Sequence, residues 1–211
     1  MFSRKEAEKA EHYNRANELC SKEQYSDALE EINKALDIDR EKSSYYYLKG
    51  QILEALGKIE ESLNAYTYAS MYDAKNATYD FHIKRLRSIL IEKQGSWMKY
   101  MGGHGNFPKS CEVHIKLTGN TIEIPELKLN IPYDKINAVN IKTEKEVMDL
   151  VYNFALIGIW AFAGNYEHNY LLLRYTDEVP MEQTLVFDGN DVLDLQPMIY
   201  KKIVEAKKGK S

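Results

Sequence analysis

The sequence is poor in cysteine and has no excess of basic charge. Its 211 residues include two cysteines, Cys20 and Cys111, which are too few for a disulfide framework and favour a reducing environment. Lysine and arginine together number 28 against 32 acidic residues, which gives a formal net charge of −4. Nucleic-acid-binding domains usually carry a concentrated basic face. We therefore expect a cytoplasmic protein that has no nucleic-acid partner.

Long apolar runs are also scarce. The longest run, residues 147–163, is interrupted by Asp149 and Asn153. A helix that spans a membrane needs about 20 apolar residues. We therefore interpret the centre of the run, residues 156–162, as a buried strand rather than a transmembrane helix.

An alternative interpretation of the same run places the protein at a membrane surface. In an exposed loop, Trp160 and Phe162 would contact a membrane or a partner protein. The basic C-terminal tail, which includes Lys207 and Lys208, would then add attraction to an anionic inner membrane face.

Motifs of catalysis and cofactor binding are absent from the sequence. It contains no Gly-x-Ser-x-Gly or His-Glu-x-x-His motif, and the glycines of residues 102–105 lack the spacing of a nucleotide-binding loop. His104, Cys111 and His114 are close in sequence, but residues three apart on a strand point to opposite faces. No fourth metal ligand is evident. We expect no enzymatic activity, no cofactor and no metal site.

An internal repeat occupies the first half of the sequence, and its period of about 34 residues is that of a known helix–turn–helix unit. An offset of 34 pairs Ala16 with Gly50, Leu19 with Leu53, Leu29 with Leu63, Ala35 with Ala69 and Tyr13 with Tyr47. The small residues among these pairs allow two helices to approach closely, while larger residues fill the space between helices. The pattern predicts helices at residues 5–21, 25–38, 43–56, 59–71 and 76–93.

The period and the small-residue positions resemble those of tetratricopeptide repeat (TPR) proteins over residues 9–76, and more loosely over residues 77–93. The resemblance implies a TPR-like domain at residues 1–93, in which two repeats and a capping helix form a solenoid with a concave groove for a peptide or partner helix. The groove positions that it implies are Tyr13, Asn17, Tyr47, Gln51, Phe81 and Arg85. Alternatively, the aromatic rings among them pack between repeats or against the rest of the chain.

The second half of the sequence changes to the alternating pattern of short strands. Expected strands occupy residues 111–117, 121–124, 127–131, 136–141, 156–162, 170–175 and 184–187, and an amphipathic helix follows at 191–207. We therefore expect a second, β-rich domain at residues 94–211.

Short pieces of this half resemble the pleckstrin-homology-like (PH-like), GRAM-type domains of prokaryotic proteins. These pieces are residues 99–104, 131–136, 158–162, 170–175 and 184–187. The resemblance implies a seven-stranded barrel that is plugged by the C-terminal helix. An unrelated small barrel and an open α+β sheet are the alternatives. Lysine is sparse near the first strand–turn–strand, where only Lys116 is close, so phosphoinositide recognition is not favoured.

Together these features predict an α+β protein that acts as a non-enzymatic adaptor. Its groove would bind a protein or peptide, and its PH-like domain would offer a second interaction surface. The alternative functions are a peripheral membrane protein that binds lipid through the PH-like domain, and a structural module that works as a homo-oligomer. The sequence does not set the oligomeric state.

Overall fold

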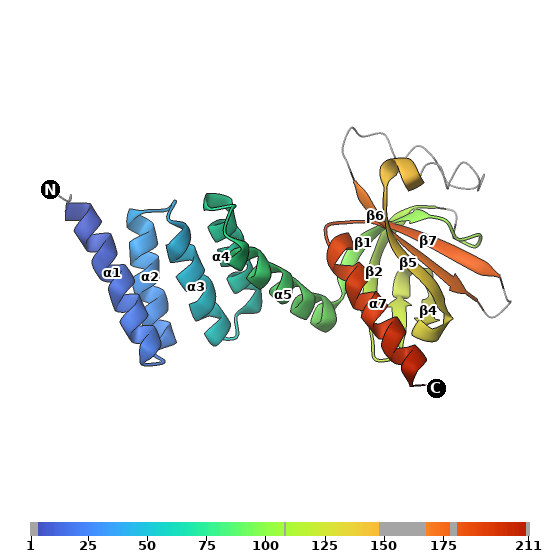
Figure 1. Cartoon of the computed structure of the whole chain (residues 1–211), viewed down its shortest axis with the longest axis horizontal. Coiled ribbons are helices and arrows are strands. Elements are labelled where there is room, and N and C mark those ends of the chain that lie inside the picture. The colour runs from blue at the N-terminus through green and yellow to red at the C-terminus, as the bar shows by residue number, and fades with distance from the viewer. Residues whose placement is uncertain (1–3, 108, 148–167, 178–180, 210–211) are drawn as a thin grey trace. The chain divides into compact units, whose positions relative to one another are not determined.

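The computed structural model describes residues 4–107, 109–147, 168–177 and 181–209. The chain divides into two compact units, Met1–Leu90 and Ile91–Ser211 (Figure 1). Helices make up the first unit and a seven-stranded antiparallel sheet dominates the second. This confirms the predicted α+β class.

Unit 1 is built from successive antiparallel helices. Its helices are α1 (Arg4–Ser21), α2 (Tyr25–Ile38), α3 (Ser43–Ala55), α4 (Ile59–Tyr72) and α5 (Ala77–Gln94), whose last residues lie in unit 2. Helix α1 packs against α2, and α3 packs against both α2 and α4. We call α1 and α2 the first repeat, and α3 and α4 the second. The predicted helices are confirmed to within a residue or two at each end, which is the usual uncertainty of helix boundaries.

The two repeats fill the space between their helices with different side chains. In the first repeat Ala16 and Ile32 are completely buried. The equivalent positions of the second repeat hold Gly50 and Tyr66, and the Tyr66 ring is also completely buried. A Cβ atom on Gly50 would lie only 2.6 Å from Cε1 of Tyr66. The larger ring therefore requires glycine on the facing helix.

Unit 2 contains one antiparallel sheet and a C-terminal helix (Figure 1). Its strands are β1 (Ser96–Gly102), β2 (Cys111–Leu117), β3 (Thr121–Ile124), β4 (Leu129–Pro132), β5 (Ile136–Thr143), β6 (Asn169–Thr176) and β7 (Glu182–Asp188), and its helix is α7 (Val192–Lys208). Two short 3-10 turns, η1 (Pro125–Leu127) and η2 (Tyr133–Lys135), flank β4. The strand order is β4-β3-β2-β1-β7-β6-β5.

The predicted closed barrel is wrong for the strands that the structure describes. β4 and β5 lie at the two ends of the strand order, so the sheet stays open. Helix α7 packs against β5, β6 and η2, and the Gln196 side chain donates to the carbonyl of Val139 on β5 at 3.5 Å. Covering a sheet edge with a helix is a common way to protect it. The strand predicted at residues 156–162 lies outside the described residues, and β1 was not predicted.

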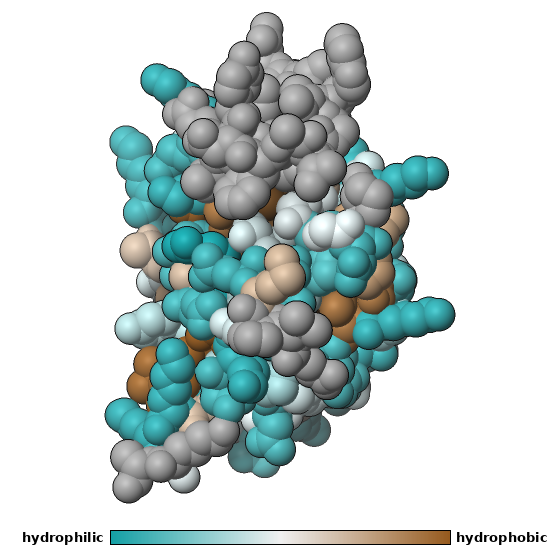
Figure 2. Space-filling view, turned by 90° about the vertical axis from the view of Figure 1, so that its right-hand side faces the viewer, coloured by the Kyte–Doolittle hydropathy of each residue, from teal (hydrophilic) through white to brown (hydrophobic). Residues whose placement is uncertain are grey.

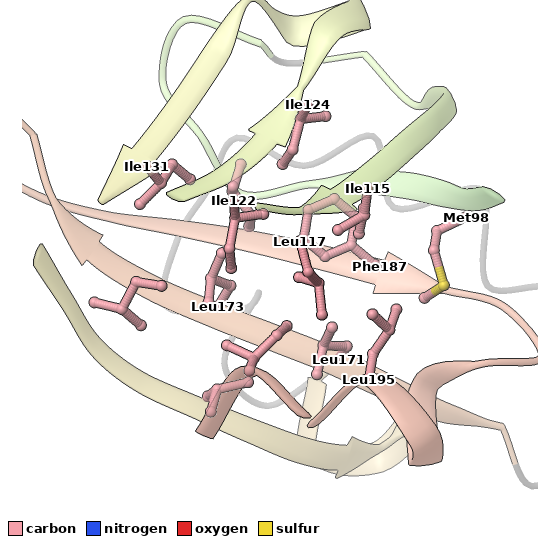
Figure 3. Close-up of a cluster of buried hydrophobic side chains, with 14 of the residues drawn as sticks. Met98, Ile115, Leu117, Ile122, Ile124, Ile131, Leu171, Leu173, Phe187 and Leu195 are labelled. Carbon is pink, nitrogen blue, oxygen red and sulfur yellow. The ribbon is translucent and has the colours of Figure 1, made fainter. Parts of the chain in front are cut away.

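The main core of unit 2 lies between the sheet and α7. Side chains from several strands and from α7 point into a common apolar interior (Figure 3). The labelled members are Met98, Ile115, Leu117, Ile122, Ile124, Ile131, Leu171, Leu173, Phe187 and Leu195. On β6, Tyr170 and Leu172 instead join a separate buried cluster with Met101, Val147 and Val186. Strand β6 is therefore apolar on both faces.

Hydrophilic residues cover most of the coloured surface in the side view, with smaller hydrophobic patches between them (Figure 2). Over the described ranges, none of the helices combines the length and the apolar character that crossing a membrane requires.

Candidate functional site

The candidate site is the set of six positions implied by the repeat, which are distributed over α1, α3 and α5. On α1, Tyr13 is half-buried and stacks on Tyr45 of α3, with ring centroids 5.0 Å apart. Asn17 is exposed, and its side-chain amide donates to the Tyr13 carbonyl at 2.9 Å. Tyr13 thus contributes to packing between the repeats, while Asn17 stays exposed at the surface of α1.

On α3, Tyr47 and Gln51 differ in the same way. The Tyr47 ring lies 5.6 Å from Tyr66, 5.4 Å from Tyr79 and 5.6 Å from His82, measured between ring centroids. Gln51 is exposed, and its side chain makes no hydrogen bond with a residue that the structure describes. Tyr47 therefore belongs to the contact between the second repeat and α5, whereas the Gln51 amide is open to solvent.

On α5, Phe81 and Arg85 complete the set. Phe81 is 65% exposed and meets the His82 ring edge-on at 5.7 Å. Arg85 forms an ion pair with Glu54 of α3. Asn17, Gln51 and Phe81 are therefore the exposed members of the predicted groove, and the other three residues contact neighbouring helices. That the six residues bind a partner stays a prediction.

Glu54 is the centre of a polar cluster that joins the second repeat to α5, and the sequence did not predict it. Its Oε1 accepts a hydrogen bond from the Tyr66 hydroxyl at 2.8 Å and lies 3.3 Å from Nδ1 of His82. The His82 ring stacks on the Tyr66 ring at 4.5 Å. Burial opposes the ionisation of Glu54, but hydrogen bonds from Arg85 and Tyr66 outweigh burial and lower the pKa of this carboxyl.

Replacing Glu54 with glutamine should give a loss of stability that depends on pH. A carboxyl whose pKa is lowered by folding stabilises the protein above its unfolded pKa of about 4.3 and loses that contribution as the pH falls. We expect Glu54→Gln to lower the free energy of unfolding by about 0.5–1 kcal/mol at pH 7, because Arg85 is partly exposed. Urea unfolding of both proteins between pH 7 and pH 3.5 should show this difference shrinking. A difference that stays constant with pH would contradict the assignment.

The residues predicted for membrane or partner contact in the second half are placed only in part. Trp160 and Phe162 lie outside the described residues. Lys207 and Lys208 lie exposed in the last turn of α7, where positive charge complements the negative end of the helix dipole. The helix dipole therefore accounts for these two lysines without contact to a membrane or a partner.

The glycine-containing segment after β1 is organised around a buried histidine. His104 is 5% exposed, and its Nδ1 accepts a hydrogen bond from the Asn106 amide at 3.1 Å. The Tyr100 hydroxyl accepts from the His104 amide and donates to the Phe107 carbonyl. Burial lowers the pKa of His104. No cluster of three or more potential metal ligands occurs within the described ranges.

Comparisons with known proteins give matches in solved structures only. No family model matches the sequence, and no curated protein matches it. The Yersinia enterocolitica type III secretion chaperone SycD, solved with a peptide of the translocator YopD, is 21% identical with a TM-score of 0.37, over 40% of this chain and 62% of that chain. The Arabidopsis OM64 TPR domain is 17% identical with a TM-score of 0.38, over 39% of this chain and 69% of that chain. This chain thus spans less than two thirds of the chaperone's length.

Proposed function

We propose that unit 1 binds a segment of another protein across Asn17, Gln51 and Phe81, and that the chain is a non-enzymatic adaptor with unit 2 as its second interaction surface. The observation that carries this proposal is that uncharged side chains are exposed at predicted groove positions on α1, α3 and α5. Asn17 and Gln51 occupy the same position in the two repeats, and both are exposed. Phe81, which matches Tyr13 and Tyr47 in the repeat, is 65% exposed.

The chemistry of these three side chains suits a peptide backbone flanked by an apolar residue. A side-chain amide offers both donors and an acceptor, so it pairs with the N–H and C=O groups of an extended or partly unwound segment. An exposed aromatic ring supplies apolar contact area with little loss of conformational entropy, and a few such residues carry most of the binding energy at interfaces. The charged member of the set, Arg85, is already paired with Glu54. The site therefore favours an uncharged segment over an acidic tail.

The structure also decides which substitutions test this proposal. Tyr13 and Tyr47 pack between helices, so removing them would weaken folding as well as binding. Asn17→Ala, Gln51→Ala and Phe81→Ala remove exposed groups and should leave the fold intact. We expect the triple variant to recover at least tenfold less partner than the unchanged protein in an affinity purification quantified by mass spectrometry.

The matched control is Asn14→Ala/Asn64→Ala, which removes exposed amides of α1 and α4 outside the three proposed positions. It should recover the same partners as the unchanged protein. Circular dichroism melting of all three proteins would show that the fold is retained. Equal partner recovery by the triple variant and the control would remove these three residues from the function.

A further inference from the structure

A second cluster of exposed aromatic side chains lies on unit 1, at the contact between α3 and α4. The ring of Tyr46 stacks on Tyr68 at 5.2 Å and on Tyr72 at 5.6 Å, measured between centroids. Tyr68 is 48% exposed, Tyr72 is 43% exposed and their neighbour Met71 is 69% exposed. We call Tyr46, Tyr68, Met71 and Tyr72 the tyrosine patch. None of its members belongs to the predicted groove.

The first repeat shows that the helical fold does not require aromatic residues at these positions. In the first repeat, the positions equivalent to the tyrosine patch hold His12, Lys34, Asp37 and Ile38. His12 and Lys34 both contact the carboxylate of Glu31 at 2.7 Å. The second repeat has Ala65 at the position of Glu31. Where the first repeat has a histidine and a lysine paired with Glu31, the second repeat therefore has tyrosines at the equivalent positions.

Next to the tyrosine patch, the end of α4 carries a carboxylate that forms no ion pair with a described residue. In the first repeat, Asp39 follows α2 and pairs with Lys9 at 2.7 Å. The equivalent carboxylate, Asp73, caps α4, and the position equivalent to Lys9 is Ser43. Asp73 makes no ion pair with a described residue.

The dipole of α4 adds to this negative character. Helix α4 has no basic residue in its last turn, and the end of a helix carries a partial negative charge of its own. Burial raises the pKa of Tyr46, and the positive charge of Arg40 partly opposes that rise. The end of α4 therefore joins apolar area to the charge of Asp73, which forms no ion pair with a described residue.

We propose that the tyrosine patch and Asp73 form a docking surface for a segment of another protein that carries a lysine or arginine next to apolar or aromatic side chains. The cation of the partner takes the place that Lys9 has beside Asp39 in the first repeat, and its apolar side chains cover the rings of Tyr68 and Tyr72. Lysine and arginine also bind favourably to the faces of aromatic rings.

A second copy of this chain fits this surface less well. A stable protein–protein interface buries about 800 Å² on each partner, whereas four partly exposed side chains supply roughly 400 Å² at most. A short segment needs only the smaller area. The tyrosine patch shares no residue with the proposed groove, so a test that contradicts one binding site leaves the other proposal unchanged.

The experiment is a selection of random phage-displayed peptides on the full chain, with a variant as the reference. The reference is Tyr68→Lys/Met71→Asp, which installs the residues of the first repeat at two exposed positions and should melt at the temperature of the unchanged protein. We expect peptides enriched on the unchanged protein over the reference to share a basic residue beside apolar or aromatic residues.

Synthetic copies of the enriched peptides then test the contribution of Asp73 by fluorescence anisotropy. Asp73→Asn should weaken binding about three- to fivefold, the effect of one exposed charge pair, and Tyr68→Lys/Met71→Asp should weaken it at least tenfold. Asn17→Ala/Gln51→Ala in the groove should leave it unchanged.

Three results would overturn the proposal. The first is a failure of the unchanged protein to enrich any peptide over the reference. The second is an enriched motif without a basic residue. The third is dimerisation of the unchanged protein, measured by light scattering, that the reference abolishes, because that result would assign the patch to a second copy of the chain.

Discussion

Replacing Gly50 with alanine is expected to destabilise unit 1 by about 2–3 kcal/mol and to lower its Tm by roughly 10–20 °C. The new Cβ would lie 2.6–2.8 Å from three atoms of the Tyr66 ring. The ring cannot move aside easily, because Tyr66 is completely buried and its hydroxyl is bound to Glu54. In an unconstrained helix the same substitution would stabilise by about 1 kcal/mol. The sign of the effect therefore tests the close packing directly, by calorimetry of the full chain.

The first repeat provides the control for this prediction. Ala16 and Ile32 occupy the positions of Gly50 and Tyr66, so Tyr66→Ile should create room for a methyl group on the facing helix. We expect Gly50→Ala to stabilise the protein in the Tyr66→Ile background, although it destabilises the unchanged protein. Such a reversal is a coupling energy between two residues in contact. Equal effects of Gly50→Ala in both backgrounds would show that the ring and the glycine do not constrain each other.

The helices of unit 1 were predictable because their signal is local and occurs twice. Small residues such as Ala16 and Ala35 have small counterparts in the second repeat, Gly50 and Ala69, and both alanines of the first repeat are completely buried. The position of Gly57 between α3 and α4 indicated a turn, and its φ of +72° is one that glycine adopts at little cost. Periodicity, together with this turn signal, therefore gave the ends of these helices.

Strand β1 was not predicted from the sequence because one of its outward positions is apolar. Ser96, Met98 and Tyr100 point inward and are buried, while Trp97 is 65% exposed. An alternation of hydrophobic and polar residues is therefore not visible at its start, and the glycines that follow suggested irregular chain. The Trp97 ring lies against the His114 ring on β2, at 4.7 Å and nearly parallel. That partner lies on a different strand, so only the structure reveals it.

The same limit applies to the surfaces of unit 1. Matching positions identified Tyr13 and Tyr47, but their packing depends on Tyr45, Tyr66 and Tyr79, which do not share their place in the repeat. Burial by neighbouring helices decides which of the matched positions stay available to a partner. The sequence thus predicted the helices that carry the candidate groove, and the structure was needed to separate its exposed residues from its packed ones.

Replacing Gly95 with alanine should destabilise unit 2 by about 3 kcal/mol or more, through backbone strain and overpacking together. Gly95 ends α5 with a φ of +79°, and its amide donates to the Ile91 carbonyl at 2.8 Å. A left-handed conformation costs other residues about 1–2 kcal/mol. In addition, a Cβ atom would lie 2.6 Å from the Ile115 carbonyl oxygen and 2.7 Å from Nε2 of His114. A backbone atom cannot yield as a flexible side chain can, so we expect overpacking to add to the conformational cost.

Gly57→Ala separates the cost of backbone strain from the cost of overpacking. Gly57 has a φ of +72°, but no atom lies within 4 Å of the position that a Cβ would take there, so alanine should cost only about 1 kcal/mol. The local loss of stability would be measured from amide hydrogen-exchange rates, in α3 and α4 for Gly57→Ala and in β1 and β2 for Gly95→Ala. His114→Ala should relieve only part of the cost of Gly95→Ala, because the Ile115 carbonyl remains in place. If Gly95→Ala costs no more than Gly57→Ala, the close approach of β2 to the end of α5 does not constrain the chain.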